Sequence, residues 1–464
     1  MNVSTTVPQL DAYLDSFTAF QKTAAGRDLD WLKKLREEAF ARFAEAGFPT
    51  THDEDWRFTN VAPIARTTFK LADPAAQKVS FDDLAAYRIP EALCSLIFVD
   101  GYFVPELSPV GTLPKGVEVK SLAAALKLNP SALEPHFGHY LDTQRDAFAA
   151  LNAAFANDGG YVHIKKGVVV EQPIHLIFVS TGGATPTMSH PRNLIVAEDE
   201  SQVAVIEEYV SLSGGVAFSN TATEMVAGES AVVSHYMLER EHPDVFNIST
   251  LRIQQARSAN VASHSILLGG GLVRNNVHPV LNGEGGNCLI NGLFLGDGTQ
   301  HLDNYMLVEH AQPHCESHQF YNGILDGKAH GVFHGRIIVH KDAQKTDAKQ
   351  TNRNLLLSDD AQIDTKPQLE IYADDVKCTH GATIGQIEEN ALFYLRSRGI
   401  DERSARKLLL LAFANECLDR MREEPVRNHI EGLINSHLFA MAHTQPIAAS
   451  GDGEGKGRNW EEVG

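Results

Sequence analysis

A cysteine and a histidine separated by one residue form the sharpest chemical pair in the sequence. Cys378 and His380 lie in the segment 375–381, which has no helical pattern and is typical of the end of a strand. Side chains two residues apart in a strand point to the same face, so a thiolate and an imidazole could bind one iron or zinc ion there. Iron–sulfur clusters and structural zinc normally take four ligands. The pair is therefore either a buried cysteine beside a hydrogen-bonded histidine, or part of a metal site that a second subunit completes.

A second group of metal-binding residue types lies between residues 310 and 318. On a helix, His310, His314 and His318 would share one face and could bind a transition metal. Pro313 and the strand-like surroundings argue against a helix, and in a strand Cys315 would point away from His314. Two interpretations stay open, a metal site or polar residues that line a coil or an interface, and the pattern favours the second.

Several catalytic motifs are absent from the sequence. It contains no GxxxxGK[ST], GxGxxG, HExxH or GxSxG, so we expect no bound nucleotide and no zinc-protease or α/β-hydrolase chemistry. The run Gly269-Gly270-Gly271 is not followed by Lys and Ser or Thr, which indicates a turn and not a phosphate-binding loop. We therefore expect a protein that is not an enzyme, and no ATP hydrolysis by the isolated chain.

The net charge of the chain limits the classes of partner that it can bind. Forty basic and 59 acidic residues give a formal charge of -19, which argues against nucleic acid and anionic lipid as partners. No segment reaches the roughly 18 consecutive apolar residues of a membrane span, and residues 1–20 lack the regions of a secretory signal. These features predict a cytoplasmic location. In that reducing compartment the five scattered cysteines are expected to be free thiols: Cys94, Cys288, Cys315, Cys378 and Cys417.

The first third of the chain has helical and mixed patterns. A hairpin is predicted at 96–104, and a helix is predicted at 146–156. Another helix is predicted at 31–43, followed by a stop at Gly47, because an apolar residue recurs at every fourth position. Its expected apolar stripe is Trp31, Leu35, Ala39 and Phe43.

After Gly160 the pattern changes to short β-rich runs separated by turns. The runs are 167–170, 175–179, 193–196, 202–206, 231–236, 261–268, 304–308, 335–339 and 369–372, and glycine turns are expected at 182–183, 214–215, 269–271, 282–283, 291–292 and 297–298. So many strands without crossover helices exclude a doubly wound α/β sheet. A sandwich, a barrel and a solenoid remain possible, and the length favours stacked coils, although the sequence has no strict repeat period.

Helical patterns return near the C-terminal end. Helices are expected at 386–398, at 402–421 with Asp401 as N-cap, and beyond Pro425. The expected apolar stripe of 402–421 runs through Leu408, Leu411, Ala412 and Leu418. The predicted organisation is an N-terminal helical or mixed domain at 1–158, a β core at 159–385, a C-terminal helical domain at 386–447 and a disordered tail at 448–464.

Five distinctive stretches lie close together between Phe333 and Ile400. They are FHGR at 333–336, DAQKTDA at 342–348, NRNLLL at 352–357, TKPQLEIYADDVKCTHGAT at 365–383 and YLRSRGI at 394–400. This dense pattern resembles the SufB/SufD family of iron–sulfur cluster assembly proteins. Two N-terminal stretches are similar to the SufD branch of that family. They are FPT at 48–50 with EDWRFT at 54–59, and FVDGYF at 98–103.

The resemblance implies a mainly β fold, a right-handed parallel β-helix flanked by an N-terminal helical or mixed domain and a C-terminal helical domain. It implies a scaffold subunit that acts with a SufB-like subunit and two copies of a SufC-like ATPase. A transient iron–sulfur cluster or iron would lie at the SufB–SufD interface, with His380 and secondarily Cys378 as ligands. The C-terminal region 400–424 would dock SufC, and alone the chain could form a homodimer.

Three basic residues near the start of the predicted helix 402–421 fit such a docking role. Arg403, Arg406 and Lys407 are unfavourable to the helix dipole at that end, so we expect them to face a partner. Two other functions stay open. One is a SufB-type, sulfur-accepting subunit, and the other is a β-helix carbohydrate-active enzyme, which would need paired catalytic groups in a groove that the sequence does not identify.

Overall fold

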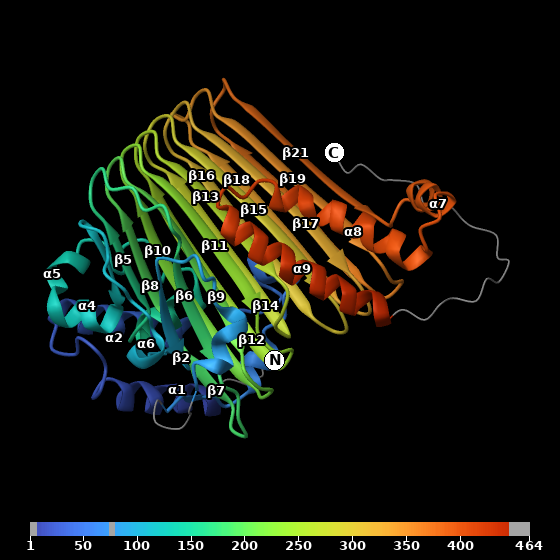
Figure 1. Cartoon of the computed structure of the whole chain (residues 1–464). Helices are drawn as coiled ribbons and strands as arrows, with labels where there is room; N and C mark the ends of the chain where they lie inside the picture. Colours follow the sequence, from blue (N-terminus) through green and yellow to red (C-terminus); the bar gives the residue numbers. More distant parts are fainter. Residues whose placement is uncertain (1–6, 74–78, 445–464) are drawn as a thin grey trace.

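Two long parallel β-sheets, stacked face to face, form the centre of the protein. The computed structural model describes residues 7–73 and 79–444. Through the core, strands that follow one another along the chain alternate between the two sheets, so each coil adds one strand to each sheet (Figure 1). This arrangement confirms the mainly β, parallel solenoid predicted from the sequence.

The strands of the core are longer than the runs that predicted them. In β9 to β21 each strand has 8 to 11 residues. The 11-stranded sheet, here sheet A, contains β1 (Lys70–Leu71), β4 (Val117–Ser121), β5 (Gly160–Ile164), β7 (Thr187–Ser189), β8 (Arg192–Ala197), β10 (Ala217–Ala227), β12 (Val245–Gln255), β14 (Leu272–Leu281), β16 (His301–His310), β18 (His330–Val339) and β20 (Gln362–Ile371). The 10-stranded sheet, here sheet B, contains β2 (Cys94–Val99), β3 (Tyr102–Phe103), β6 (Ile174–Ser180), β9 (Gln202–Ser211), β11 (Val232–Arg240), β13 (Asn260–Leu267), β15 (Asn287–Gly296), β17 (Glu316–Leu325), β19 (Asp347–Leu356) and β21 (Lys377–Gly385).

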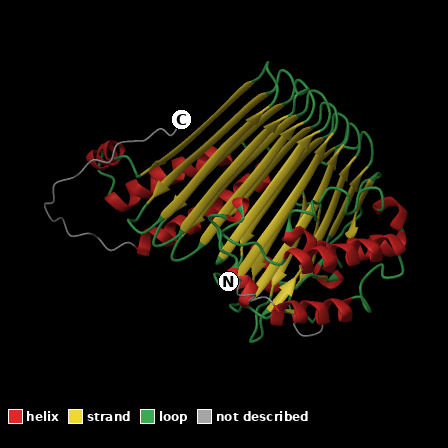
Figure 2. Ribbon diagram, turned by 180° about the vertical axis from the view of Figure 1, so that it is seen from behind, coloured by secondary structure: helices red, strands yellow, loops and turns green. Residues whose placement is uncertain are grey.

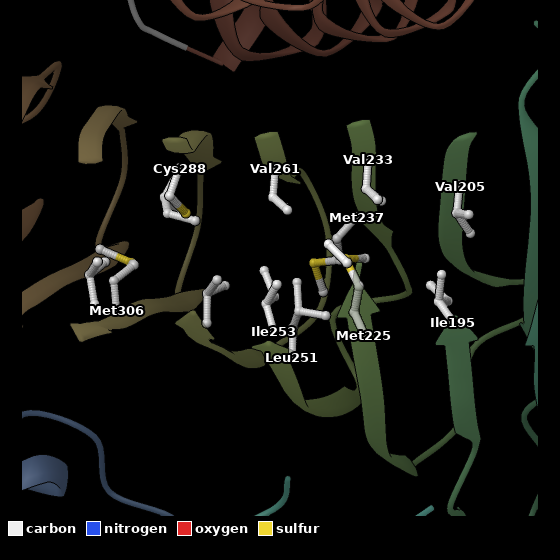
Figure 3. Packing of buried hydrophobic residues seen from close by; sticks show 14 of the residues in the cluster. Ile195, Val205, Met225, Val233, Met237, Leu251, Ile253, Val261, Cys288 and Met306 are labelled. Carbon is white, nitrogen blue, oxygen red and sulfur yellow. The ribbon is translucent and has the colours of Figure 1, made fainter. Parts of the chain in front are cut away.

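Rows of apolar side chains fill the space between the sheets. Because parallel strands pair in register, inward side chains of successive coils stack on one another. The result is one continuous core along the solenoid, and its burial stabilises the stack by roughly 25 cal/mol per Å² of apolar surface. Figure 3 shows part of it, with Ile195, Met225 and Ile253 from sheet A opposite Val233, Val261 and Cys288 from sheet B.

Helices cover the outer faces of the sheets in two places (Figures 1 and 2). The N-terminal helices α1 (Val7–Phe20), α2 (Asp30–Ala46) and α6 (Ala147–Phe155) pack through aromatic rings on sheet A, where Phe148 lies 5.9 Å from Phe218. The C-terminal helices α8 (Glu402–Leu418) and α9 (Glu424–Thr444) lie across sheet B. The shorter helices are α3 (Ala62–Arg66), α4 (Leu122–Leu128), α5 (Pro130–Leu133) and α7 (Glu389–Ser397), with 3₁₀ turns η1 (Glu54–Trp56), η2 (Asp82–Tyr87) and η3 (Pro105–Leu107).

Local signals placed several elements correctly. The predicted hairpin is the antiparallel pair β2 and β3. The helix predicted at 146–156 is α6, and Asp146 caps it by accepting hydrogen bonds from two backbone N–H groups. Asp401 caps α8 by accepting from the Ser404 N–H at 3.0 Å. None of the helices within 7–73 and 79–444 is long and apolar enough to cross a membrane, and the tail 448–464 lies outside the described residues.

Two other local predictions are wrong. Asn291-Gly292, predicted as a turn, lies inside β15, because Gly292 leaves room for the ring of Tyr321. The segment 167–170, predicted as a strand, forms only an isolated bridge at Val169. Turn-favouring residues in a strand interior here serve close packing between coils.

The buried faces of α2 and α8 also differ from the predicted stripes. Positions four residues apart drift around a helix of 3.6 residues per turn, so the sheet selects a neighbouring stripe. The residues buried by α2 are Leu32, Arg36, Ala39, Phe40 and Phe43. Those buried by α8 are Ala405, Leu410, Ala414, Cys417 and Leu418, while Leu408 is 47% exposed.

The last coil leaves both sheets with an open edge. β20 ends sheet A and β21 ends sheet B, and in the part of the chain that the structure describes neither has a strand on its outer side. Figure 1 shows β21 as the outermost strand, far from the N-terminal helices. The unpaired N–H and C=O groups of such an edge are a template for pairing with another chain.

Gly292→Ala is expected to destabilise the solenoid by about 1–3 kcal/mol, because it overpacks the core. The added Cβ atom would come within 2.1 Å of Tyr321 Cε1. Urea unfolding measures the change. Gly432→Ala in α9, where the added atom meets nothing within 4 Å, is the control and should stabilise by about 0.5–1 kcal/mol. An unchanged unfolding free energy for Gly292→Ala would show that this contact is not tight.

Candidate functional site

Strand β21 carries Cys378 and His380 on its inward face. Along this strand Lys377, Thr379 and Gly381 are exposed, whereas Cys378 and His380 are partly buried. The alternation confirms that the two side chains share one face, as their spacing predicted. They lie on the outermost strand of sheet B, at the open end of the solenoid.

The neighbouring strand β19 sets the surroundings of the pair. Cys378 is in register with Ala348, and His380 is in register with Gln350. The thiol packs against the edge of the apolar core, and burial raises the pKa of Cys378. Nδ1 of His380 is enclosed and has no hydrogen-bond partner among residues 7–73 and 79–444. The pair thus presents a protonated thiol and an imidazole with an unused nitrogen.

This pair alone is too small for a complete metal site. In residues 7–73 and 79–444, no group of three or more His, Cys, Asp or Glu side chains could hold a metal ion. The inward neighbours of the pair on β19 are Ala348 and Gln350, and neither is a carboxylate or a thiol. A cluster or iron ion at Cys378 and His380 would therefore need ligands beyond these neighbours.

The structure separates the residues of the 310–318 group. His310 is buried at the end of β16, with Nε2 2.8 Å from Ser317 Oγ, and burial lowers its pKa to about 4. Cys315 packs in the core between the sheets. His314 lies in a turn with its side chain 59% exposed, and His318 is on the outer face of β17. Their separation supports the second interpretation, polar residues that line a coil.

Sequence reasoning missed two glutamines behind His380. Gln350 Nε2 donates to Gln319 Oε1 at 2.7 Å, and the two residues are 31 positions apart. His380 occupies the equivalent position one coil later. A sequence repeat with the length of one coil could have predicted this row. The loops differ in length from coil to coil, so the repeat is not visible in the sequence.

The side chains of Glu239 and Glu241 are buried and share hydrogen-bond donors. Asn247 Nδ2 donates at 2.8 Å to both Glu239 and Glu241. Ser180 and Ser219 donate to the same Glu241 oxygen at 2.5 and 2.9 Å, and burial raises the pKa of both carboxyl groups. Glu241 also borders a cavity of about 860 Å³ beside Asp297 and His437, but its carboxyl oxygens are held by donors within the protein.

The N-terminal EDWRFT stretch is held on the outer face of sheet A. Thr59 Oγ1 donates to Asp303 Oδ2 at 2.5 Å, and Arg274 binds the same carboxylate oxygen at 2.6 Å. The Arg274 guanidinium also lies 3.9 Å from the centre of the Trp56 ring. The stretch therefore fastens the N-terminal region to strands β14 and β16.

The three basic residues of α8 have contacts within this chain. Arg406 pairs with Glu402 at 3.1 Å. Arg403 and Lys407 lie over the ring of Phe439 in α9, at 5.3 and 5.2 Å. These contacts weaken the prediction that the three cations face a partner, because two of them already contact α9.

Comparison with known proteins gives a consistent result along the chain. Residues 178–413 match the family model "SUF system FeS cluster assembly, SufBD core domain", and residues 8–176 match "SufBD protein N-terminal region". An iron–sulfur cluster assembly SufBD family protein of Synechocystis sp. is 35% identical over 412 residues, which cover 86% of this chain and 90% of that protein. The iron–sulfur cluster assembly protein SufD of Escherichia coli is 32% identical over 404 residues, covering 87% and 92%. SufD of Bacillus subtilis is 26% identical over 444 residues, covering 94% and 99%.

We expect iodoacetamide to modify Cys378 before any other cysteine of the native chain, because the other four are buried. Burial raises the pKa of the Cys378 thiol, so little thiolate exists at neutral pH and the labelling rate should rise as the pH becomes alkaline. Peptide mass spectrometry measures the site and the rate. Cys378→Ser should abolish the early label. Equal early labelling of Cys417 would contradict the burial described here.

Proposed function

The chain belongs to the SufBD family of the SUF system for iron–sulfur cluster assembly, and we propose that it is the SufD-like scaffold subunit there, without enzymatic activity of its own. The observation that carries the proposal is the position of Cys378 and His380 on the open edge of the solenoid. Two ligands at an unpaired edge suit a site shared between subunits. The missing nucleotide-binding motifs are consistent with an ATPase supplied by another chain.

We propose that a SufB-like subunit docks along β20 and β21. Backbone groups on this edge are free to extend both sheets into a partner. Apolar side chains lie at the same edge, since Ile371, Tyr372 and Ile384 are 41%, 62% and 42% exposed. Lys366 on β20 is bound by Glu54 of the N-terminal stretch at 3.0 Å, which helps to hold the edge strand in place. The same edge suits a homodimer when the partner is missing.

The shared site would hold an iron ion or a nascent cluster as cargo. An imidazole nitrogen is a competent iron ligand, and histidine in place of thiolate raises the reduction potential of a cluster. Cys378 is the secondary ligand, because its raised pKa makes the thiolate harder to form. The SufB-like partner would supply the other ligands.

We propose that a SufC-like ATPase docks on the C-terminal helices, mainly through α7 and the outer side of α8. The inner side of α8 is already packed on sheet B. Phe393 and Tyr394 on α7 are 74% and 58% exposed, and Figure 1 shows α7 beyond the strand ends. A cavity of about 450 Å³ beside Phe393 and Arg406 offers a recess for a partner side chain.

His380→Ala should fold and assemble with its partners but fail to support cluster formation. Cluster yield on the reconstituted complex, followed by visible absorption, measures the loss. His318→Ala is the matched control, because His318 lies on the outer face of the same sheet, and it should leave the yield unchanged.

If His380 has only a structural role, a different result is expected for His380→Ala. A purely structural histidine would leave cluster yield unchanged and lower the stability by about 1–3 kcal/mol. Thermal unfolding of the variant beside cluster reconstitution separates the two roles. Normal yield with a lowered Tm would refute the ligand assignment.

Phe393→Asp should weaken capture of the ATPase by about 2 kcal/mol or more, roughly thirtyfold in Kd, if α7 supplies a docking hot spot. Binding is measured by calorimetry with the purified ATPase. Leu128→Asp is the control, since Leu128 is 70% exposed on α4 at the other end of the molecule. Unchanged affinity for Phe393→Asp would move the docking surface elsewhere.

A further inference from the structure

A row of amide side chains runs inside the last coils and ends at His380. Gln319 on β17 is in register with Gln350 on β19, and Gln350 is in register with His380 on β21. Both glutamines are 2% exposed. In-register neighbours of a sheet are about 4.8 Å apart, so long side chains on one row reach each other.

Sheet A, opposite this row, leaves space for the two glutamine side chains. Gly335 on β18 faces the two amides, and a Cβ atom at that position would lie 1.9 Å from Gln350 Nε2 and 2.9 Å from Gln319 Oε1. Any other residue at 335 would displace the Gln350 amide. Glycine at this position therefore keeps the pair of amides in place.

Three buried polar atoms along the row have no hydrogen-bond partner in the part of the chain that the structure describes. Gln350 Nε2 donates to Gln319 Oε1 at 2.7 Å, which uses one end of each amide. The unused atoms are Gln319 Nε2, Gln350 Oε1 and His380 Nδ1. Buried polar groups are nearly always paired, so an acceptor and an imidazole nitrogen that neighbour each other in register require an explanation.

We propose that Gln350 is a positioning residue for His380. Its Oε1 accepts a hydrogen bond from Nδ1–H when the side chains close on each other. That bond fixes the tautomer in which the Nε2 lone pair is free to bind iron. This inference rests on the proposed role of His380 as a ligand.

Gln319 sets the direction of the hydrogen bond between Gln350 and His380. Because Gln319 Oε1 accepts from Gln350 Nε2, the Gln350 carbonyl oxygen is the end left for His380. If both amides were reversed, Gln350 Nε2 would donate to Nδ1 and the proton would move to Nε2, where it blocks metal binding. The direction of the amide row thus selects the ligating nitrogen.

Nuclear magnetic resonance of the full-length chain, labelled with ¹⁵N-histidine, tests the proposal without any cluster. His380 signals are assigned by their loss in His380→Ala. The wild-type chain should show His380 with its proton on Nδ1. Gln350→Met, which keeps the shape and removes the acceptor, should shift His380 toward the Nε2–H form, and Gln350→Glu should restore the Nδ1–H form.

Two further variants provide a second test and a control. Gln319→Met frees the Gln350 amide to reverse and should give a mixture of tautomers, which keeps the test available if Gln350→Met does not fold. Gln368→Met is the matched control, because Gln368 Oε1 lies 2.8 Å from His334 Nε2. It should change the signals of His334 and leave those of His380 alone.

A His380 proton on Nε2 in the wild-type chain, or a tautomer unchanged by Gln350→Met and Gln319→Met, would overturn the proposal. On the reconstituted complex, Gln350→Met is expected to weaken iron binding about ten- to a hundredfold, with rescue by Gln350→Glu. If His380→Ala supports normal cluster formation, the proposed function fails. If only the tautomer is insensitive to Gln350, this inference fails and the ligand assignment stands.

Discussion

In-register parallel pairing stacks each side chain of one coil on its counterpart in the next. Ser317, Ala348 and Cys378 form one such inward row, and Gln319, Gln350 and His380 form the next. A shift of one residue in any strand would exchange the inward and outward faces of all side chains of that strand. The core, the covering of the outer faces by helices and the geometry at the open end all depend on this register.

The space between the sheets holds polar as well as apolar rows. In the middle coils the apolar row of Ile253 and Val261 (Figure 3) is accompanied by buried polar side chains such as His235, which forms a hydrogen bond with Ser263. In the last coils Gln350, Asn352 and Asn354 are buried on β19. The apolar rows stabilise the stack, whereas the buried polar groups need hydrogen-bond partners.

A buried ion pair joins the N-terminal region to the first coils. Arg192 and Glu224 are in contact with no exposure of either side chain. The backbone N–H groups of Gly138 and Tyr140 donate to the Glu224 carboxylate at 2.7 and 2.8 Å. These added hydrogen bonds make the buried pair tolerable, because its desolvation otherwise exceeds the attraction. The pair therefore fixes where the N-terminal segment sits more than it adds to stability.

The sequence by itself determined the features that depend on near neighbours in the chain. These include the caps at Asp146 and Asp401, the many strands without crossover helices, and the common face of Cys378 and His380. Side-chain alternation and capping are local, so a few residues suffice to specify them. The stretches that resemble a known family made it possible to predict the whole solenoid and not only these local features.

Only the tertiary structure decided which distant residues meet. In-register partners lie 28 positions apart at His235 and Ser263 but 31 apart at Gln319 and Gln350. Loop length varies from coil to coil, so no fixed period in the sequence could place a glutamine beside His380. The same freedom put Asn291-Gly292 inside a strand, because Tyr321 of the next coil needed the space. Packing between coils is decided by register across the whole sheet, and register is not a property of any one segment.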